Sequence, residues 1–405
     1  MPARERRSAA LMLPLAILCS AALAEDWELA GYVALEPRLF VDRPQFSGQP
    51  ARGLSWSGVL APELRREWDD GRNRVTLAPF VRIDQHDRRR SHADLREASW
   101  QHVSGPWTVV AGVSKVFWGV TEARHLVDIV NQTDLVEDLS GDEKLGQPML
   151  RIERWGERGT VALFVLPGFR ERTFPADDAR LRGTLPIATG RAQYESGAGR
   201  WRVDLALRWA HATGPFDLGL SAFHGTSREP RLVPTELAPA RVALVPHYDV
   251  ITQAGAEVQY TRGAWLGKLE AILRRGHGDT FGAAVAGFEY TFFGVRGSAA
   301  DVGLLAEYLY DGRGRRAPPT IFDDDVFVGL RLALNDPDST MLLAGVIVDR
   351  GGGGTVARVQ AERRLGAAWK LEFEARSFHG VARADPMLGG VRNDSFVMLR
   401  IARFF

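Results

Sequence analysis

Cysteine is nearly absent from this sequence of 405 residues, whose single cysteine is Cys19. One cysteine cannot form an internal disulfide, and it cannot supply the several thiolates of a structural metal site. Long hydrophobic runs are also missing: after residue 25 none approaches the roughly 20 apolar residues that a transmembrane helix needs, and the mean hydropathy is −0.15. The sequence therefore excludes a disulfide-stabilised scaffold and a helical membrane protein.

Signals of catalysis and of nucleic-acid binding are scarce as well. The formal net charge is +1, so no basic excess points to nucleic acid. There is no G-x-S-x-G nucleophile elbow, and none of the nine histidines forms an H-E-x-x-H zinc motif. His224 and Ser227 lie close together, but no acid stands at a persuasive spacing for a triad. We expect no enzyme, no cofactor and no metal site.

Residues 1–24 have the pattern of a secretory signal peptide. Arg4, Arg6 and Arg7 form a basic start, an apolar core covers 9–17, and Ala22-Leu23-Ala24 provides a small-x-small cleavage site near Ala24. The apolar core is too short for a membrane anchor. Cleavage would remove three arginines and Glu5, so the net charge would fall from +1 to about −1.

The chain that follows consists of segments of about ten residues in which apolar and polar side chains alternate between Gly, Asp, Asn and Pro turns. In 201–211, for example, Trp201, Val203 and Leu205 share one face, opposite Arg202 and Asp204. Such segments are strands with one apolar and one polar face, which occur in transmembrane barrels and also in soluble β-sandwiches. The pattern recurs in 74–84, 265–274, 326–334 and 369–376.

Two further features favour the barrel. Short turns alternate with longer connections, as periplasmic turns alternate with outer loops. Aromatic residues stand at the ends of apolar faces, as membrane-interface girdles require: Trp201, Trp265, Trp369, Tyr308, Tyr310 and Phe405. We predict an all-β fold with one domain, residues 25–405, forming a single antiparallel transmembrane β-barrel of about 18 strands, with 16 possible. This count merges residues 191–200 into the strand that runs to residue 212.

The last twelve residues, D-S-F-V-M-L-R-I-A-R-F-F, alternate in the same way and end on Phe405. They resemble the C-terminal strand of Gram-negative outer-membrane β-barrels, although Arg403 stands where that family usually has an apolar residue. The resemblance implies location in the cell outer membrane. It also implies three kinds of partner: the barrel-assembly machinery, outer-membrane lipid and lipopolysaccharide.

The longest connection, within 116–151, has the most distinctive sequence. Its apolar residues, such as Leu126, Val127 and Ile129, suffice for a short helix or two, and such loops seldom lie free on the surface. Trp118-Gly119, followed by an Asp-x-x-Asn-x-x-Asp run at 128–134, resembles a family of uncharacterised proteobacterial outer-membrane channels. That resemblance implies a channel but no substrate.

We predict that this partly helical loop, 119–146, folds into the lumen and constricts it. The alternative is an outer cap across the barrel mouth. The candidate constriction residues are Glu122, Arg124, His125, Asp128, Asn131 and Asp134. The same loop also presents Glu137, Asp138, Asp142, Glu143 and Lys144.

The polar faces of the strands predict a lumen lined by charges of both signs. Those in 358–376 come from adjacent strands and should form a cross-strand ladder. Rows of opposite charge filter solutes by charge, and a salt-bridged structural wall is an equally compatible interpretation. The candidate lumen charges are Arg82, Arg202, Arg208, Lys268, Glu270, Arg331, Arg358, Glu362, Lys370, Glu372 and Arg376.

A second loop, within 164–182, contains Arg170, Arg172, Arg180 and Arg182. It could attract anions or lipopolysaccharide phosphates at the mouth, or it could be an ordinary solvated loop.

Together these features lead to the hypothesis of an outer-membrane porin or substrate-selective channel for small polar or charged solutes. The alternatives are an export channel that works with a periplasmic machine, a barrel-embedded enzyme such as a lipid hydrolase, and a structural barrel with a closed lumen.

Overall fold

The computed structural model describes residues 26–51, 53–352 and 354–405. The predicted signal peptide, residues 1–24, lies outside the described residues. Within the described part, no helix is long and apolar enough to cross a membrane.

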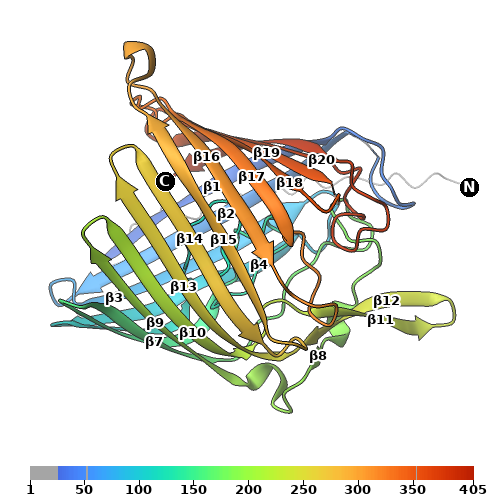
Figure 1. Ribbon diagram of the computed structural model, residues 1–405, viewed down its shortest axis with the longest axis horizontal. Coiled ribbons are helices and arrows are strands. Elements are labelled where there is room, and N and C mark those ends of the chain that lie inside the picture. Colours follow the sequence, from blue (N-terminus) through green and yellow to red (C-terminus); the bar gives the residue numbers. More distant parts are fainter. Residues whose placement is uncertain (1–25, 52, 353) are drawn as a thin grey trace, which may run out of the picture.

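The fold is one antiparallel sheet of 18 strands that closes on itself (Figure 1). Each strand pairs with its neighbour along the chain, and β21 returns to β1, with Tyr32 opposite Phe404. Closure leaves no strand at an open edge of the sheet, which a lipid environment demands. The strands are β1 (Trp27–Phe40), β2 (Gly53–Trp68), β3 (Asn73–Asp84), β4 (His92–Ser104), β5 (Trp107–Ser114), β6 (Gln147–Gly156), β7 (Gly159–Pro167), β9 (Val203–Thr213), β10 (Phe216–Thr226), β13 (Val250–Arg262), β14 (Trp265–Arg275), β15 (Phe281–Phe292), β16 (Asp301–Asp311), β17 (Asp324–Ala333), β18 (Met341–Asp349), β19 (Thr355–Leu365), β20 (Trp369–His379) and β21 (Phe396–Phe404).

The predicted barrel and its count of 18 strands are confirmed. Short turns lie at one end of the barrel and longer connections at the other; we call these the short-turn end and the long-loop end. The extension of β9 backward over 191–200 was wrong. Gly199 has φ +55°, a left-handed conformation that ends an extended run, and β9 begins only at Val203.

Part of 191–200 belongs instead to a small sheet outside the barrel. β8 (Gln193–Tyr194) pairs in parallel with β12 (Arg241–Tyr248), which pairs with β11 (Arg231–Ala238). Figure 1 shows this hairpin projecting from the long-loop end. Within the described residues, three 3-10 turns complete the regular structure: η2 (Thr189–Arg191), η3 (Gly199–Trp201) and η4 (Val295–Gly297).

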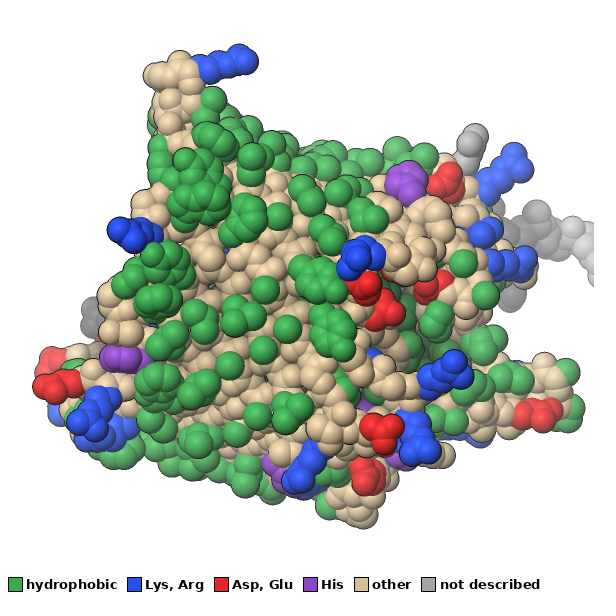
Figure 2. Space-filling model, in the orientation of Figure 1, with side chains coloured by type: hydrophobic (Ala, Val, Ile, Leu, Met, Phe, Trp, Pro, Cys, Tyr) green, Lys and Arg blue, Asp and Glu red, His purple; other side chains and the backbone are tan. Residues whose placement is uncertain are grey.

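The outer surface of the barrel is apolar over the strands. On β9, the exposed residues Val203, Leu205 and Leu207 alternate with the buried residues Asp204 and Ala206. Figure 2 shows hydrophobic side chains spread over the strands and charged ones gathered toward the ends. The aromatics predicted for the interface are all exposed: Trp201, Trp265, Trp369, Tyr308, Tyr310 and Phe405. This distribution is that of a membrane-embedded barrel.

The largest hydrophobic cluster lies on the inner side of the wall. Inward-facing side chains of β7, β10 and β14–β17, such as Phe164, Phe223 and Ile272, pack against Leu126, Val127 and Val130 of the β5–β6 connection. A barrel of this size has room for a loop inside it, and here part of that room is occupied by packed apolar side chains.

Candidate functional site

The β5–β6 connection, hereafter segment 115–146, is bound to one side of the barrel by two carboxylates. Glu270 of β14 accepts hydrogen bonds from the backbone N–H groups of Val120 (2.7 Å) and Thr121 (3.0 Å). Glu307 of β16 accepts the N–H groups of Glu122 (2.7 Å) and Ala123 (2.8 Å). Because Glu270 has no exposed surface, these bonds to a buried charge hold the segment strongly against the wall.

Trp118 and Gly119 explain the distinctive start of the segment. The Trp118 ring is buried and meets Phe164 edge-on at 5.4 Å between centroids. Gly119 has φ +137°, and a Cβ there would lie 2.8 Å from the Glu270 carboxylate. A side chain at 119 would therefore displace the group that binds the segment. The short helix predicted for this segment was wrong: residues 115–146 contain no helix. The N–H groups of residues 120–123 bond the carboxylates of Glu270 and Glu307 instead of helical carbonyls.

The second half of the segment is bound to the opposite side of the barrel by ion pairs. Glu137 pairs with Arg82 of β3 at 2.7 Å, Asp138 with Arg376 of β20 at 3.3 Å, and Asp142 with Arg358 of β19 at 3.0 Å. Burial raises the pKa of Asp138, but Arg376 and Arg358 outweigh it and hold that pKa below its ordinary value. The segment thus contacts inward-facing side chains on two sides of the barrel.

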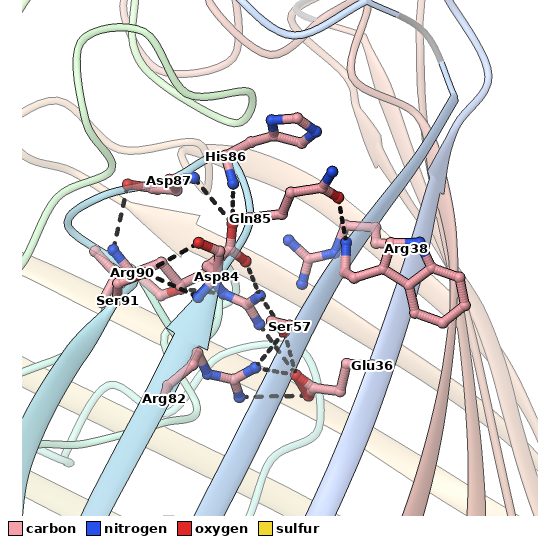
Figure 3. Close-up of polar contacts among 12 residues, drawn as sticks. Glu36, Arg38, Ser57, Arg82, Asp84, Gln85, His86, Asp87, Arg90 and Ser91 are labelled. Carbon is pink, nitrogen blue, oxygen red and sulfur yellow. Dashed lines mark hydrogen bonds and ion pairs between the residues drawn. The ribbon is translucent and has the colours of Figure 1, made fainter. Parts of the chain in front are cut away.

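Arg82 belongs to a buried network on β1–β3 (Figure 3). It pairs with Glu36 of β1, and both side chains are 4% exposed. Arg90, from the β3–β4 connection, bonds Asp84 at 2.7 Å and Ser57 at 2.9 Å, and it also lies 3.3 Å from Glu36. Each acid in this group is shared with or directly bonded to an arginine, so the network is a rigid, internally neutralised part of the wall.

Arg38 lies two residues from Glu36 on the same inward face and differs from its neighbours. Figure 3 shows its guanidinium pointing into the space beside the network without a dashed contact. It reaches only the sulfur of Met398 at 3.5 Å and the face of the Phe396 ring at 4.7 Å. Among the described residues no carboxylate pairs with it. Its Nε is buried without a partner, and the residue lines the cavity described next.

A cavity of about 810 Å³ runs along this side of the barrel. At the short-turn end it reaches Gly31, Glu63 and Phe404, and at the long-loop end it reaches His86 and Leu181. Its lining contains charges of both signs, including Arg38, Arg400, Lys115 and Glu143. Burial raises the pKa of Glu143.

The predicted lumen charges divide into three groups. Those that line the cavity are Arg82, Arg331, Arg358, Glu362, Glu372 and Arg376, and Lys370 lines a smaller pocket at the short-turn end. Three lie on the wall that carries the β14–β16 contacts or beside it: Arg208, Lys268 and Glu270. Arg202 lies before β9 begins and contacts His224.

The ladder predicted for 358–376 is present, with an unexpected register. Like charges stand directly opposite one another, Arg358 with Arg376 and Glu362 with Glu372. The ion pairs run diagonally instead, as from Lys370 to Glu362 at 2.8 Å. Diagonal neighbours in a sheet are within reach of long side chains.

None of the six predicted constriction residues lines the cavity. Three of them bind the β14–β17 wall: Glu122 pairs with Arg331 (2.6 Å), Arg124 with Asp311 (3.0 Å), and His125 lies 3.7 Å from Glu270. The other three are buried: Asp128 pairs with Lys144, Asn131 bonds backbone groups at both ends of the segment, and Asp134 pairs with Arg96. The lining residues of the segment are Lys115 at its start and residues 135–139 and 142–143 later on.

Sequence reasoning also missed Glu36, Arg38, Arg400 and Glu307. The signal for all four was available, because each alternates with outward-facing apolar residues in its strand.

The β7–β9 connection, hereafter segment 168–202, crosses the long-loop end. It leaves β7 but bonds residues beside β1 and β21: Ala179 O accepts from Gln49 (2.8 Å), and Arg180 pairs with Asp394 (2.5 Å). Asp394 has no exposed surface, and the Arg180 side chain is 3% exposed. Arg180 therefore forms a buried ion pair that holds segment 168–202 in place across the long-loop end. Arg170 is also paired, with Asp94 at 2.6 Å.

His224 and Ser227 do not form a catalytic pair in this structure. His224 is exposed on the lipid-facing side of β10, whereas Ser227 is fully buried and donates to the Glu229 carbonyl at 2.9 Å.

No protein-family model matches the chain, and no curated protein matches it. Solved structures with the same fold include a BenF-like porin from Pseudomonas fluorescens Pf-5 (TM-score 0.56, 10% identity, 94% of this chain and 97% of that chain). Two others are OccK2 (OpdF) of Pseudomonas aeruginosa in complex with glucuronate (0.53, 10%, 94% and 95%) and Wzi of Escherichia coli, a carbohydrate-binding barrel involved in capsule assembly (0.52, 10%, 91% and 83%). At these identities the likeness establishes the fold, that of outer-membrane β-barrels.

Proposed function

We propose that this protein is an outer-membrane porin-type channel through which small polar or charged solutes cross. The observation that carries the proposal is the cavity of about 810 Å³, whose lining extends from residues at the short-turn end to residues of the long loops. In this proposal the short turns face the periplasm and the long loops face outward. The porin fold of the BenF-like protein and OccK2 supports it.

Segment 115–146 forms the constriction in this proposal. Its first half is packed on the β14–β16 wall, and its acids at 137, 138 and 142 reach the arginines of the other side. The open path then lies between residues 135–143 and the β1–β3 and β18–β21 wall. Charges of both signs line that path, so a solute is selected by where its charges fall and not by net charge alone.

The test is single-channel conductance of refolded residues 25–405 in planar bilayers. We compare the wild type with the triple variant Glu137→Gln, Asp138→Asn and Asp142→Asn. Stable conductance steps that become larger in the variant are expected, because the variant keeps side-chain size but loses the ion pairs that hold the segment across the path.

A matched control is the double variant Asp336→Asn and Asp338→Asn. It also removes acids paired with an arginine, Arg363, but in the β17–β18 turn. Its conductance should equal that of the wild type. Silence of the wild type, with the barrel shown to be folded, contradicts the channel proposal.

A closed, solute-binding barrel is the second candidate, and segment 168–202 favours it. This segment crosses the long-loop end and is fastened by the buried pair Arg180–Asp394. Conductance that emerges only when this pair is broken would favour a gated or closed barrel. For the export channel and the barrel enzyme, no contact among the described residues supplies a supporting observation.

A further inference from the structure

The lipid-facing rows of three neighbouring strands end on polar side chains at the long-loop end. On β14 the exposed row Trp265, Leu269 and Leu273 continues to the exposed Arg275. On β10 the row that contains Leu220 continues to His224. These polar ends stand at the boundary between the hydrocarbon region and the headgroups.

The polar ends are joined side by side across the sheet. Arg202 lies 2.8 Å from His224 Nε2, and His224 Nδ1 lies 2.9 Å from the Thr252 hydroxyl on β13. Thr252 stands directly opposite Arg275 in the register of β13 with β14. The row from β9 to β14 covers three strand spacings of about 4.8 Å, roughly 14 Å in all.

The row is basic and poorly neutralised. Arg200 lies over the ring of Trp201, which is 71% exposed beside it. In the part of the chain that the structure describes, no acidic side chain pairs with Arg200 or Arg275. The single acidic partner of Arg202 among the described residues is Asp204, at 3.7 Å. Three arginines and an imidazole therefore gather beside an exposed indole where headgroups lie.

We propose that this surface, made of Arg200, Trp201, Arg202, His224, Thr252 and Arg275, binds the phosphate groups of a glycolipid in the outer leaflet. Arginine forks match phosphate oxygens in pairs of hydrogen bonds, and the indole of Trp201 suits the interface itself. The width of the row lets one headgroup with two phosphates reach both ends. The inference rests on the outward orientation of the long loops, and it is independent of solute passage.

The test is native mass spectrometry of the purified full chain in detergent, titrated with bisphosphorylated lipid A. Dephosphorylated lipid A and phosphatidylglycerol are the comparison lipids. The main variant is Arg200→Gln with Arg275→Gln. The matched control is Arg262→Gln: Arg262 is exposed on the same outward row of β13, but at the short-turn end.

We expect the wild type and Arg262→Gln to bind bisphosphorylated lipid A equally. Each arginine near a charged membrane surface contributes about a fivefold effect, so the double variant should bind roughly 30-fold more weakly. Each single variant should bind bisphosphorylated lipid A about fivefold more weakly. Folding of every variant is judged by heat-dependent migration on a denaturing gel. If the double variant does not fold, the single variants still test the proposal.

Equal binding by the double variant, or equal binding of dephosphorylated lipid A, overturns the proposal. Phosphatidylglycerol bound as tightly as lipid A also overturns it, because the surface would then recognise any anionic lipid. Because channel conductance is measured separately, failure here leaves the proposed function standing, and the reverse holds as well.

Discussion

The buried pair between Arg180 and Asp394 offers the sharpest test of how the long-loop end is closed. Asp394 accepts from Arg180 Nε at 2.5 Å and from the backbone N–H of Leu181 at 2.9 Å. Arg180 also donates to the carbonyls of Asp42 and Asn393. This one pair therefore joins segment 168–202 to the connections on either side of the β1–β21 seam.

The substitution Asp394→Asn keeps the shape of the side chain but leaves the arginine charge buried without its partner. Breaking a buried pair in this way costs about 3–5 kcal/mol. The substitution destabilises the conformation in which segment 168–202 is bound across the long-loop end. The population in which this segment is open should therefore rise roughly a hundredfold or more.

The assay is limited trypsin cleavage of the folded protein, with fragments identified by mass spectrometry. Asp394→Asn retains every arginine of the segment as a cleavage site, including Arg180, Arg182 and Arg191. Cleavage follows the open population when opening is fast relative to proteolysis.

Asp177→Asn is the control on the same segment. Its partner Arg89 is 3.7 Å away and both side chains are partly exposed, so its loss should cost about 0–1 kcal/mol. Replacement of both buried partners, Arg180→Met with Asp394→Leu, should restore resistance, because no unpaired charge remains. Equal cleavage rates for Asp394→Asn and Asp177→Asn would refute the reasoning.

Two further predictions concern single side chains. Arg38→Gln should lower the permeability of anions relative to cations about fivefold, the effect of one charge of about 1 kcal/mol beside the path, as measured by the reversal potential in a salt gradient; an unchanged reversal potential would place Arg38 outside the ion path. Burial and then Arg274 lower the pKa of His277 from 6.5 to about 4, and its side chain is fully buried in the β14–β15 connection. Because the unfolded chain then binds the proton first as pH falls, stability should be intact above pH 6.5 and decline toward pH 4 by about 3 kcal/mol. His277→Gln should remove that part of the pH dependence of urea unfolding, and an identical slope for the variant would count against it.

The fold could be predicted because the pattern that defines it, the alternation of apolar and polar side chains, is local in the sequence. A strand that separates lipid from a wet interior must alternate at every position, as Val203–Asp204–Leu205 does, and this alternation is visible without any partner strand. The same rule identified most of the inward charges, including Arg82, Arg358 and Arg376. It failed at 191–200, where Gly199, with φ +55°, ends the extended conformation.

The positions of the residues within segment 115–146 could not be predicted in the same way. Its apolar content correctly indicated that it would not lie free, but its partners are Glu270 and Glu307, which are more than a hundred residues away. Whether an acid of the segment faces the cavity, as Glu137 does, or is buried in a pair, as Asp134 is, depends on where those distant strands stand around the barrel.

By itself the sequence determined the barrel, a count of about 16 to 18 strands and the apolar belt, because the alternation between lipid and lumen is imposed residue by residue. Only the tertiary structure decided which inward-facing charged side chains form ion pairs and which do not. In the sequence Arg82 and Arg38 cannot be distinguished, because each is an arginine on the inward face of a strand. The neighbouring strands β1–β3 and segment 115–146 bring Glu36 and Glu137 to Arg82. Closure of β21 on β1, by contrast, brings a methionine sulfur and a phenyl ring to Arg38, and no carboxylate among the described residues pairs with it. Ion pairs across a barrel join residues far apart in the chain, so their pairing is a property of the closed sheet and not of any strand within it.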